Sequence, residues 1–117
     1  MATNTDLSIF QGTDKTYTVT VTDSAGDAID ITGYTFLFTV KRNKRDADSD
    51  AIISKNVTSH TDPTAGETAI AIDRADTLNQ KIIAYPYDIQ MIDTSSKRIE
   101  VMYGDFKIED AITERDI

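Results

Sequence analysis

Apolar and polar side chains alternate along most of this chain, and this period of two constrains the fold more than any other feature. The segment TYTVTVT (16–22) alternates threonine with tyrosine or valine. The segment YTFLFTVKR (34–42) places Phe36 and Phe38 in one apolar row with Tyr34 and Val40. Successive side chains of a strand point to opposite faces, so this pattern predicts strands with one buried face.

The alternation recurs in other short segments that are bounded by turn residues, for a total of seven or eight predicted strands. The segments are 29–31, 51–57, 68–74, 81–93 and 98–110. Residues 73–80 do not alternate, and Asp73 is a suitable N-cap, so we expect one short helical turn near 74–80. Many short, regularly spaced strands are typical of an all-β antiparallel sandwich or barrel, rather than of a β–α–β fold.

The segment KIIAYPYDIQMID (81–93) has strand spacing but contains a proline. Tyr85 and Tyr87 share a row with Ile89 and Met91, and Pro86 lies between them. Proline cannot donate a hydrogen bond to a sheet, so we expect Pro86 to face outward at a point that is not paired on both sides. The two tyrosines should pack inward, with their hydroxyls near the rim of the core.

The last predicted strand changes register. Ile99, Val101 and Tyr103 fall on one face, whereas Phe106 and Ile108 fall on the other if the period is unbroken. One extra residue near Gly104 would bring both rows to the same side, which predicts a β-bulge at that point. On this interpretation Tyr103 faces the core.

Length and charge limit the classes of function. The chain has 117 residues, which predicts a single domain over 1–117 with loose ends at 1–5 and 114–117. It has no cysteine, and 20 acidic against 12 basic residues give a net charge of −8. Such a chain is repelled by nucleic acid and by anionic membranes, so neither is an expected partner. The N-terminus lacks the pattern of a signal peptide, which predicts synthesis and folding in the cytoplasm.

Four segments together resemble a known family. They are FQGTDKTYTVTVTDSAGDAIDITGYTFLFTVKR (10–42), AIDRADTLN (71–79), YPYDIQMID (85–93) and VMYGDFKIEDAIT (101–113). Their order and spacing resemble the Ig-like β-sandwich domains of tailed-bacteriophage virion proteins, in particular the N-terminal domain of phage upper baseplate proteins. In those proteins a longer C-terminal part follows this domain. The resemblance therefore implies an Ig-like antiparallel β-sandwich with a role in the virion, and leaves its position in the particle open.

Two groups of polar residues are candidate sites. Asp46, Asp48 and Asp50 occupy alternate positions, as at the start of a calcium loop, but an EF-hand would need Gly and Glu where Ala51 and Val57 stand. The alternative is a solvated acidic loop balanced by the basic residues of 41–45. His60 is the only histidine, and we expect it to lie exposed on a loop.

Asp88 is a third candidate, with two competing roles. It could bond to backbone or threonine on the exposed sheet face, or pair with Glu100 or Asp105 for glycoside chemistry. Nothing in the sequence aligns these carboxylates. We therefore expect no enzymatic activity, no catalytic residue and no cofactor.

The resemblance and the residues together predict a structural protein of a bacteriophage virion, in the tail tip or baseplate, that acts by protein–protein docking. The expected partners are other virion proteins or copies of the same chain, and the candidate docking surfaces are loops 41–50 and 58–67 and the tail after Ile112. One alternative is a head decoration protein. Another is a carbohydrate-binding adhesion module for host recognition, but the absence of Trp and the inward rows of Tyr and Phe argue against it.

Overall fold

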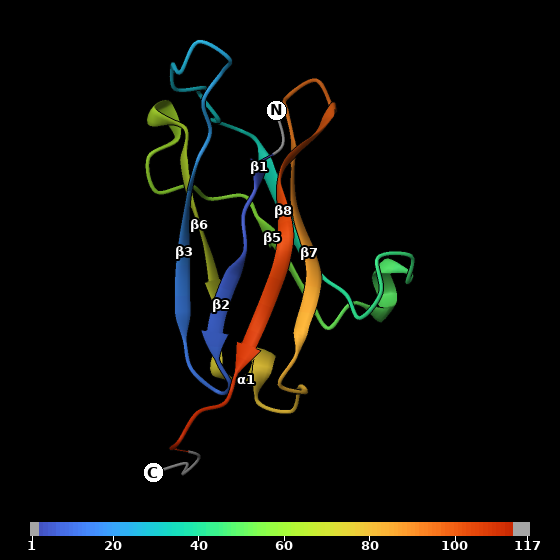
Figure 1. Ribbon diagram of the computed structural model, residues 1–117. Helices are drawn as coiled ribbons and strands as arrows, with labels where there is room; N and C mark the ends of the chain where they lie inside the picture. Colours follow the sequence, from blue (N-terminus) through green and yellow to red (C-terminus); the bar gives the residue numbers. More distant parts are fainter. Residues whose placement is uncertain (1–2, 114–117) are drawn as a thin grey trace.

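The computed structural model describes residues 3–113, and within them the chain forms eight strands and three very short helices (Figure 1). The strands are β1 (Thr3–Asn4), β2 (Leu7–Phe10), β3 (Lys15–Thr20), β4 (Thr35–Val40), β5 (Ile53–Val57), β6 (Glu67–Ile72), β7 (Ala84–Ile92) and β8 (Arg98–Glu109). The helices are η1 (Asp48–Asp50), η2 (Pro63–Ala65) and α1 (Arg74–Thr77). The helical turn expected near 74–80 is therefore present, and the two other turns were not predicted.

The strands form two sheets that face each other. The larger sheet has the order β1-β8-β7-β4-β5, with β2 also paired to β8, and the smaller sheet consists of β3 and β6. Immunoglobulin-like sandwiches divide their strands in the same way, with strands B and E facing strands C, F and G. The all-β, Ig-like sandwich is thus confirmed. The sheets are not wholly antiparallel, however, because β1 and β2 run parallel to β8.

The core lies between the sheets and is built from the alternating rows. Phe36, Phe38 and Val40 of β4 are fully buried, as are Ile70 and Ile72 of β6. The alternation on these two strands therefore predicted the buried face correctly. The outward faces of the same strands carry a mixture of polar and apolar side chains, Thr35, Leu37 and Thr39 on β4 and Glu67, Ala69 and Ala71 on β6.

The two tyrosines of β7 point inward, as predicted. Tyr85 is 1% exposed and Tyr87 is 4% exposed. The Tyr85 hydroxyl donates to the backbone carbonyl of Lys81 at 3.0 Å, a bond that corresponds to the tyrosine corner of Ig-like domains. Pro86 faces outward, and β4 ends at Val40 opposite Tyr87, so the proline lies just beyond that pairing. The tyrosine-proline-tyrosine sequence thus has an architectural role.

The N-terminal segment is anchored along β8. β1 and β2 continue one register, with Thr3 opposite Met102 and Leu7 opposite Phe106. The Tyr87 hydroxyl donates to the carbonyl of Thr5 between them. Burial raises the pKa of Tyr87 to about 12, so this hydroxyl stays protonated as a donor at neutral pH. Residues 3–5 were expected to be loose, and the structure corrects this; 1–2 and 114–117 lie outside the described residues.

The bulge of β8 lies three residues earlier than predicted. Ile89 pairs with Met102 and the next residue of β7, Gln90, pairs with Glu100, so Val101 is the extra residue. The shift turns Tyr103 outward, where it is 40% exposed, instead of into the core. Gly104 has a different role, since a Cβ there would lie 2.4 Å from the carbonyl oxygen of Thr5. The glycine allows the N-terminal segment to approach β8 closely.

His60 is not an exposed loop residue, as was expected. It is half-buried, its Nδ1 lies 2.8 Å from the hydroxyl of Thr68, and its Nε2 lies 2.8 Å from the carbonyl oxygen of Tyr34. A carbonyl only accepts hydrogen bonds, so Nε2 carries the proton and donates to it. The ring also packs edge-on against Phe36. His60 therefore fixes loop 58–66 to the sandwich.

Candidate functional site

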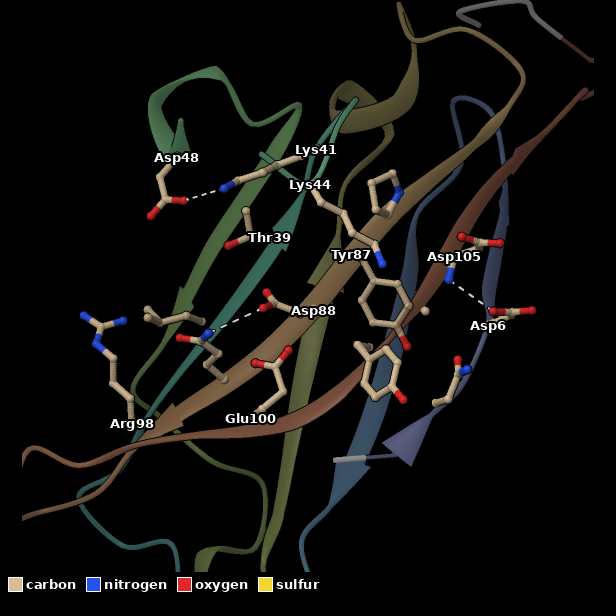
Figure 2. A pocket seen from close by; sticks show the side chains of 16 residues that line it. Asp6, Thr39, Lys41, Lys44, Asp48, Tyr87, Asp88, Arg98, Glu100 and Asp105 are labelled. Carbon is tan, nitrogen blue, oxygen red and sulfur yellow. Dashed lines mark hydrogen bonds and ion pairs between the residues drawn. The ribbon is translucent and has the colours of Figure 1, made fainter. Parts of the chain in front are cut away.

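The outward face of the large sheet carries a hollow of about 670 Å³. Its floor consists of outward side chains of β4, β7 and β8, and its walls come from residues 41–48 on one side and residues 4–6 on the other (Figure 2). In Figure 1 the loop between β4 and β5, coloured teal to green, projects away from the sheet beside this face. We call this site the outer hollow.

The strand register sets the floor of the outer hollow. Residues that pair across neighbouring strands have Cβ atoms about 5 Å apart, so they form rows across the face. Each row takes one residue from β4, one from β7 and one from β8. The two central rows are Thr39–Asp88–Tyr103 and Leu37–Gln90–Glu100.

Two carboxyl groups meet at the centre of the floor. Asp88 and Glu100 come from adjacent strands and point toward each other (Figure 2). Burial, followed by the hydrogen bond with Asp88 and the charge of Asp88, raises the pKa of Glu100 to about 7, while Gln90 opposes the shift. Gln90 Nε2 also lies 3.5 Å from Asp88 Oδ2. Near neutral pH, Glu100 therefore exchanges between a protonated donor and an ionised acceptor.

This pair answers the question left open for Asp88. The structure brings it to Glu100 and not to Asp105, which lies opposite Pro86 and whose amide donates to Asp6 Oδ1 at 3.1 Å. In glycosidases the two carboxyls stand about 5–9 Å apart with the sugar between them. Asp88 and Glu100 instead share a hydrogen bond. This geometry fits a binding surface better than a hydrolytic site.

The wall formed by residues 41–48 carries the basic side chains. Lys41 Nζ forms an ion pair with Asp48 Oδ1 at 2.8 Å and donates to the carbonyl of Asp46 at 2.8 Å. The hydrogen bond and charge of Lys41 lower the pKa of Asp48. Lys44 also lines the hollow, as does Arg98 at the start of β8. The loop thus places positive charge beside the carboxyls of the floor.

The three aspartates of this loop do not converge on one point. Asp48 is paired with Lys41, and Asp46 Oδ2 accepts from the amide of Asn43 at 3.2 Å. Asp50 is exposed at the end of η1. Over residues 3–113 no group of three or more acidic or histidine side chains is placed to hold a metal ion.

Tyr103 is the residue of the outer hollow that the sequence pattern misplaced. It lies opposite Asp88 on the floor, and its ring is exposed because the bulge at Val101 rotates it away from the core. Only the exact site of the bulge would have placed Tyr103 on the outward face. Alternation alone does not give this, since one extra residue restores the pattern equally well at several positions.

Comparisons with known proteins find similarity among solved structures alone. No family model matches this chain, and no curated protein matches it. Among the solved structures that match is a crystal structure of ICOS in complex with ICOS-L and an anti ICOS-L VNAR domain. The match has a TM-score of 0.48 and 6% sequence identity, and it covers 94% of this chain but 56% of the other. None of the helices in the described part of the chain is long and apolar enough to cross a membrane.

Proposed function

We propose that this chain is a structural protein of a tailed-bacteriophage virion, at the tail tip or baseplate, and that it assembles by docking onto protein neighbours. The resemblance of four sequence segments to phage baseplate domains supports the virion role. The Ig-like sandwich is compatible with it, because such a scaffold presents loops and ends from a rigid core. The proposed docking rests on a group of exposed apolar side chains at one end of the sandwich.

We call this group the apolar end. Phe10 is 56% exposed, Ile83 is 51% exposed and Ile112 is fully exposed, and Leu78 and Ile82 are exposed as well. β2 and β8 run toward this end, which also holds α1 (Figure 1). Exposed apolar side chains that gather in one region are typical of protein–protein contact sites.

The loops of the apolar end are held rigidly by polar contacts. The amide of Gly12 donates to the buried hydroxyl of Thr77 at 2.9 Å. Gln11 Nε2 donates to the carbonyl of Gln80 at 2.7 Å, and Arg74 Nη1 donates to the carbonyl of Gly12 at 3.0 Å. A surface that is already ordered loses little conformational entropy when it binds. The apolar end is therefore suited to docking.

The three docking surfaces expected from the sequence have different surroundings in the structure. Loop 41–50 forms a wall of the outer hollow, and loop 58–67 is fixed to the core by His60. The tail after Ile112 begins beside the apolar end, because β8 ends there at Glu109 (Figure 1). The apolar end and the start of this tail are thus the favoured docking surface.

Labelling of intact particles tests the proposal. Gold-conjugated antibodies against this chain should label one end of the tail in electron micrographs of phage purified from the producing culture. Label on the capsid would favour the head decoration alternative instead. Particles that lack the chain would contradict a role in the virion.

Variants test the docking surface. Ile83→Ser combined with Phe10→Ser should reduce incorporation into particles, because both changes remove apolar contact area from the apolar end. Tyr103→Ser is the control, since it removes an exposed aromatic ring from the outer hollow, which does not include the residues of the apolar end. Equal loss of incorporation in the control would contradict docking through the apolar end. Circular dichroism of each purified variant verifies that it is folded.

A further inference from the structure

The size and place of the outer hollow suit a small ligand. Its volume of about 670 Å³ lies within the range of about 300–1,000 Å³ that is usual for ligand sites in proteins. Its floor is formed by three adjacent strands, which position side chains more rigidly than loops do. Neighbouring strands are about 4.8 Å apart, so a ligand about as wide as a hexose ring would touch two strands at once.

The charges of the outer hollow disfavour an anionic ligand. Its acidic side chains Asp6, Asp88, Glu100 and Asp105 outnumber Lys44 and Arg98. Lys41 and Asp48 already neutralise each other in an ion pair. Among uncharged ligands, this polar lining favours one that is rich in hydrogen-bonding groups.

Tyr103 indicates that this ligand also has an apolar face. Its ring is 40% exposed within the polar hollow, and no described residue hydrogen-bonds to its hydroxyl. An exposed ring with a polar tip suits a ligand that is apolar on one face and polar at its edge. A sugar ring has this shape, with C–H groups on its faces and hydroxyls around its rim.

The polar groups beside Tyr103 complement hydroxyls. Asp88 lies directly across from Tyr103, and Gln90 and Glu100 form the adjacent row. An ionised carboxylate accepts, a protonated carboxyl donates, and an amide does both. Each hydroxyl of a sugar is both a donor and an acceptor, so this mixed set can satisfy neighbouring hydroxyls of one ring.

We propose that the outer hollow binds a neutral saccharide, with one sugar ring stacked on Tyr103 and its hydroxyls bonded to Asp88, Gln90 and Glu100. This site is separate from the apolar end, which lies where β2 and β8 end, so both surfaces can be occupied at once. The inference does not depend on assembly into a virion. It reverses the argument that inward-facing aromatics exclude carbohydrate, because Tyr103 faces outward.

The test is a titration of the ¹⁵N-labelled full chain with neutral oligosaccharides, followed by NMR. The probes are chito-, cello-, malto- and galacto-oligosaccharides up to about 10 mM, a range that detects binding as weak as a millimolar Kd. We expect at least one of these probes to shift amide signals in 37–41, 87–90 and 98–105, with little change in β3 and β6. No binding by any probe in this range would overturn the proposal.

Three variants connect the binding to the site. Tyr103→Ala should weaken the affinity about tenfold or more, and Tyr103→Phe should retain most of it because the ring remains. Asp88→Asn should also weaken it, since the amide replaces an acceptor with a donor. Thr18→Ala on the outward face of β3 is the control and should bind normally. If Tyr103→Ala binds as well as the parent, or if only acidic saccharides or basic peptides bind, the proposal is wrong.

Discussion

Glu100 is the described carboxyl with the most strongly altered chemistry. Its pKa is raised to about 7 from an ordinary 4.5, mainly by burial and then by Asp88. The folded state therefore holds the proton of Glu100 more tightly than the unfolded chain does. The contribution of Glu100 to the free energy of unfolding consequently falls as the pH rises. The cost of ionising Glu100 is absent below about pH 4.5 and is complete above about pH 7.

Replacing Glu100 by glutamine should remove this cost. We expect Glu100→Gln to raise the free energy of unfolding at pH 8 by roughly 1 kcal/mol, after allowance for solvent screening of a partly exposed group, and to change it little at pH 4. Urea denaturation at pH 4, 6 and 8 measures the difference. Glu109→Gln on the same strand is an exposed control. A gain that is equal at all three pH values would contradict the assignment.

Individual elements show what alternation can and cannot predict. It identified β4, β6 and β7 because each of these strands has one face in the core. It did not locate the bulge of β8 or the anchoring of residues 3–5, because both depend on contacts between segments that are far apart in the sequence. The sequence left Glu100 and Asp105 as alternative partners of Asp88 for a related reason, since alternation assigns a residue to a face but does not set the register between two strands.

The close approach of the N-terminal segment to β8 can be tested by a single substitution at Gly104. Gly104 has φ of +153°, and a Cβ there would lie 2.4 Å from the backbone carbonyl oxygen of Thr5, which cannot move aside as a flexible side chain could. Gly104→Ala should therefore destabilise the protein by about 2–3 kcal/mol and loosen β1 from β8. Urea denaturation gives the first effect, and faster amide exchange at Thr5, which donates to Tyr103, gives the second.

Gly26→Ala is the matched control for this substitution. Gly26 also has a positive φ, of +86°, but nothing lies within 4 Å of a Cβ built there. Its loss of stability should be about 1 kcal/mol, the backbone strain alone. If both variants lose the same amount, close approach of the N-terminal segment is not the reason for a glycine at 104.

The whole molecule carries a net charge of −8. Within residues 3–113, ion pairs join Lys41 to Asp48 and Lys55 to Asp73 and Asp76. Repulsion between acidic groups should therefore oppose folding and also keep copies of the chain apart. Copies of the chain should therefore associate through surfaces such as the apolar end, where apolar contact can outweigh the repulsion.

Salt should consequently stabilise this protein. Raising NaCl from 10 to 200 mM shortens the Debye length from about 30 Å to below 10 Å, which screens the repulsion between carboxylates. We expect the Tm at pH 7.5 to rise by about 3 °C, the equivalent of somewhat less than 1 kcal/mol for a domain of this size. Near pH 4.4, the isoelectric point expected from the sequence, the net charge vanishes and the rise should disappear. Differential scanning calorimetry at both pH values measures the effect, and a Tm that falls with salt at pH 7.5 would show that attractive charge pairs outweigh the repulsion.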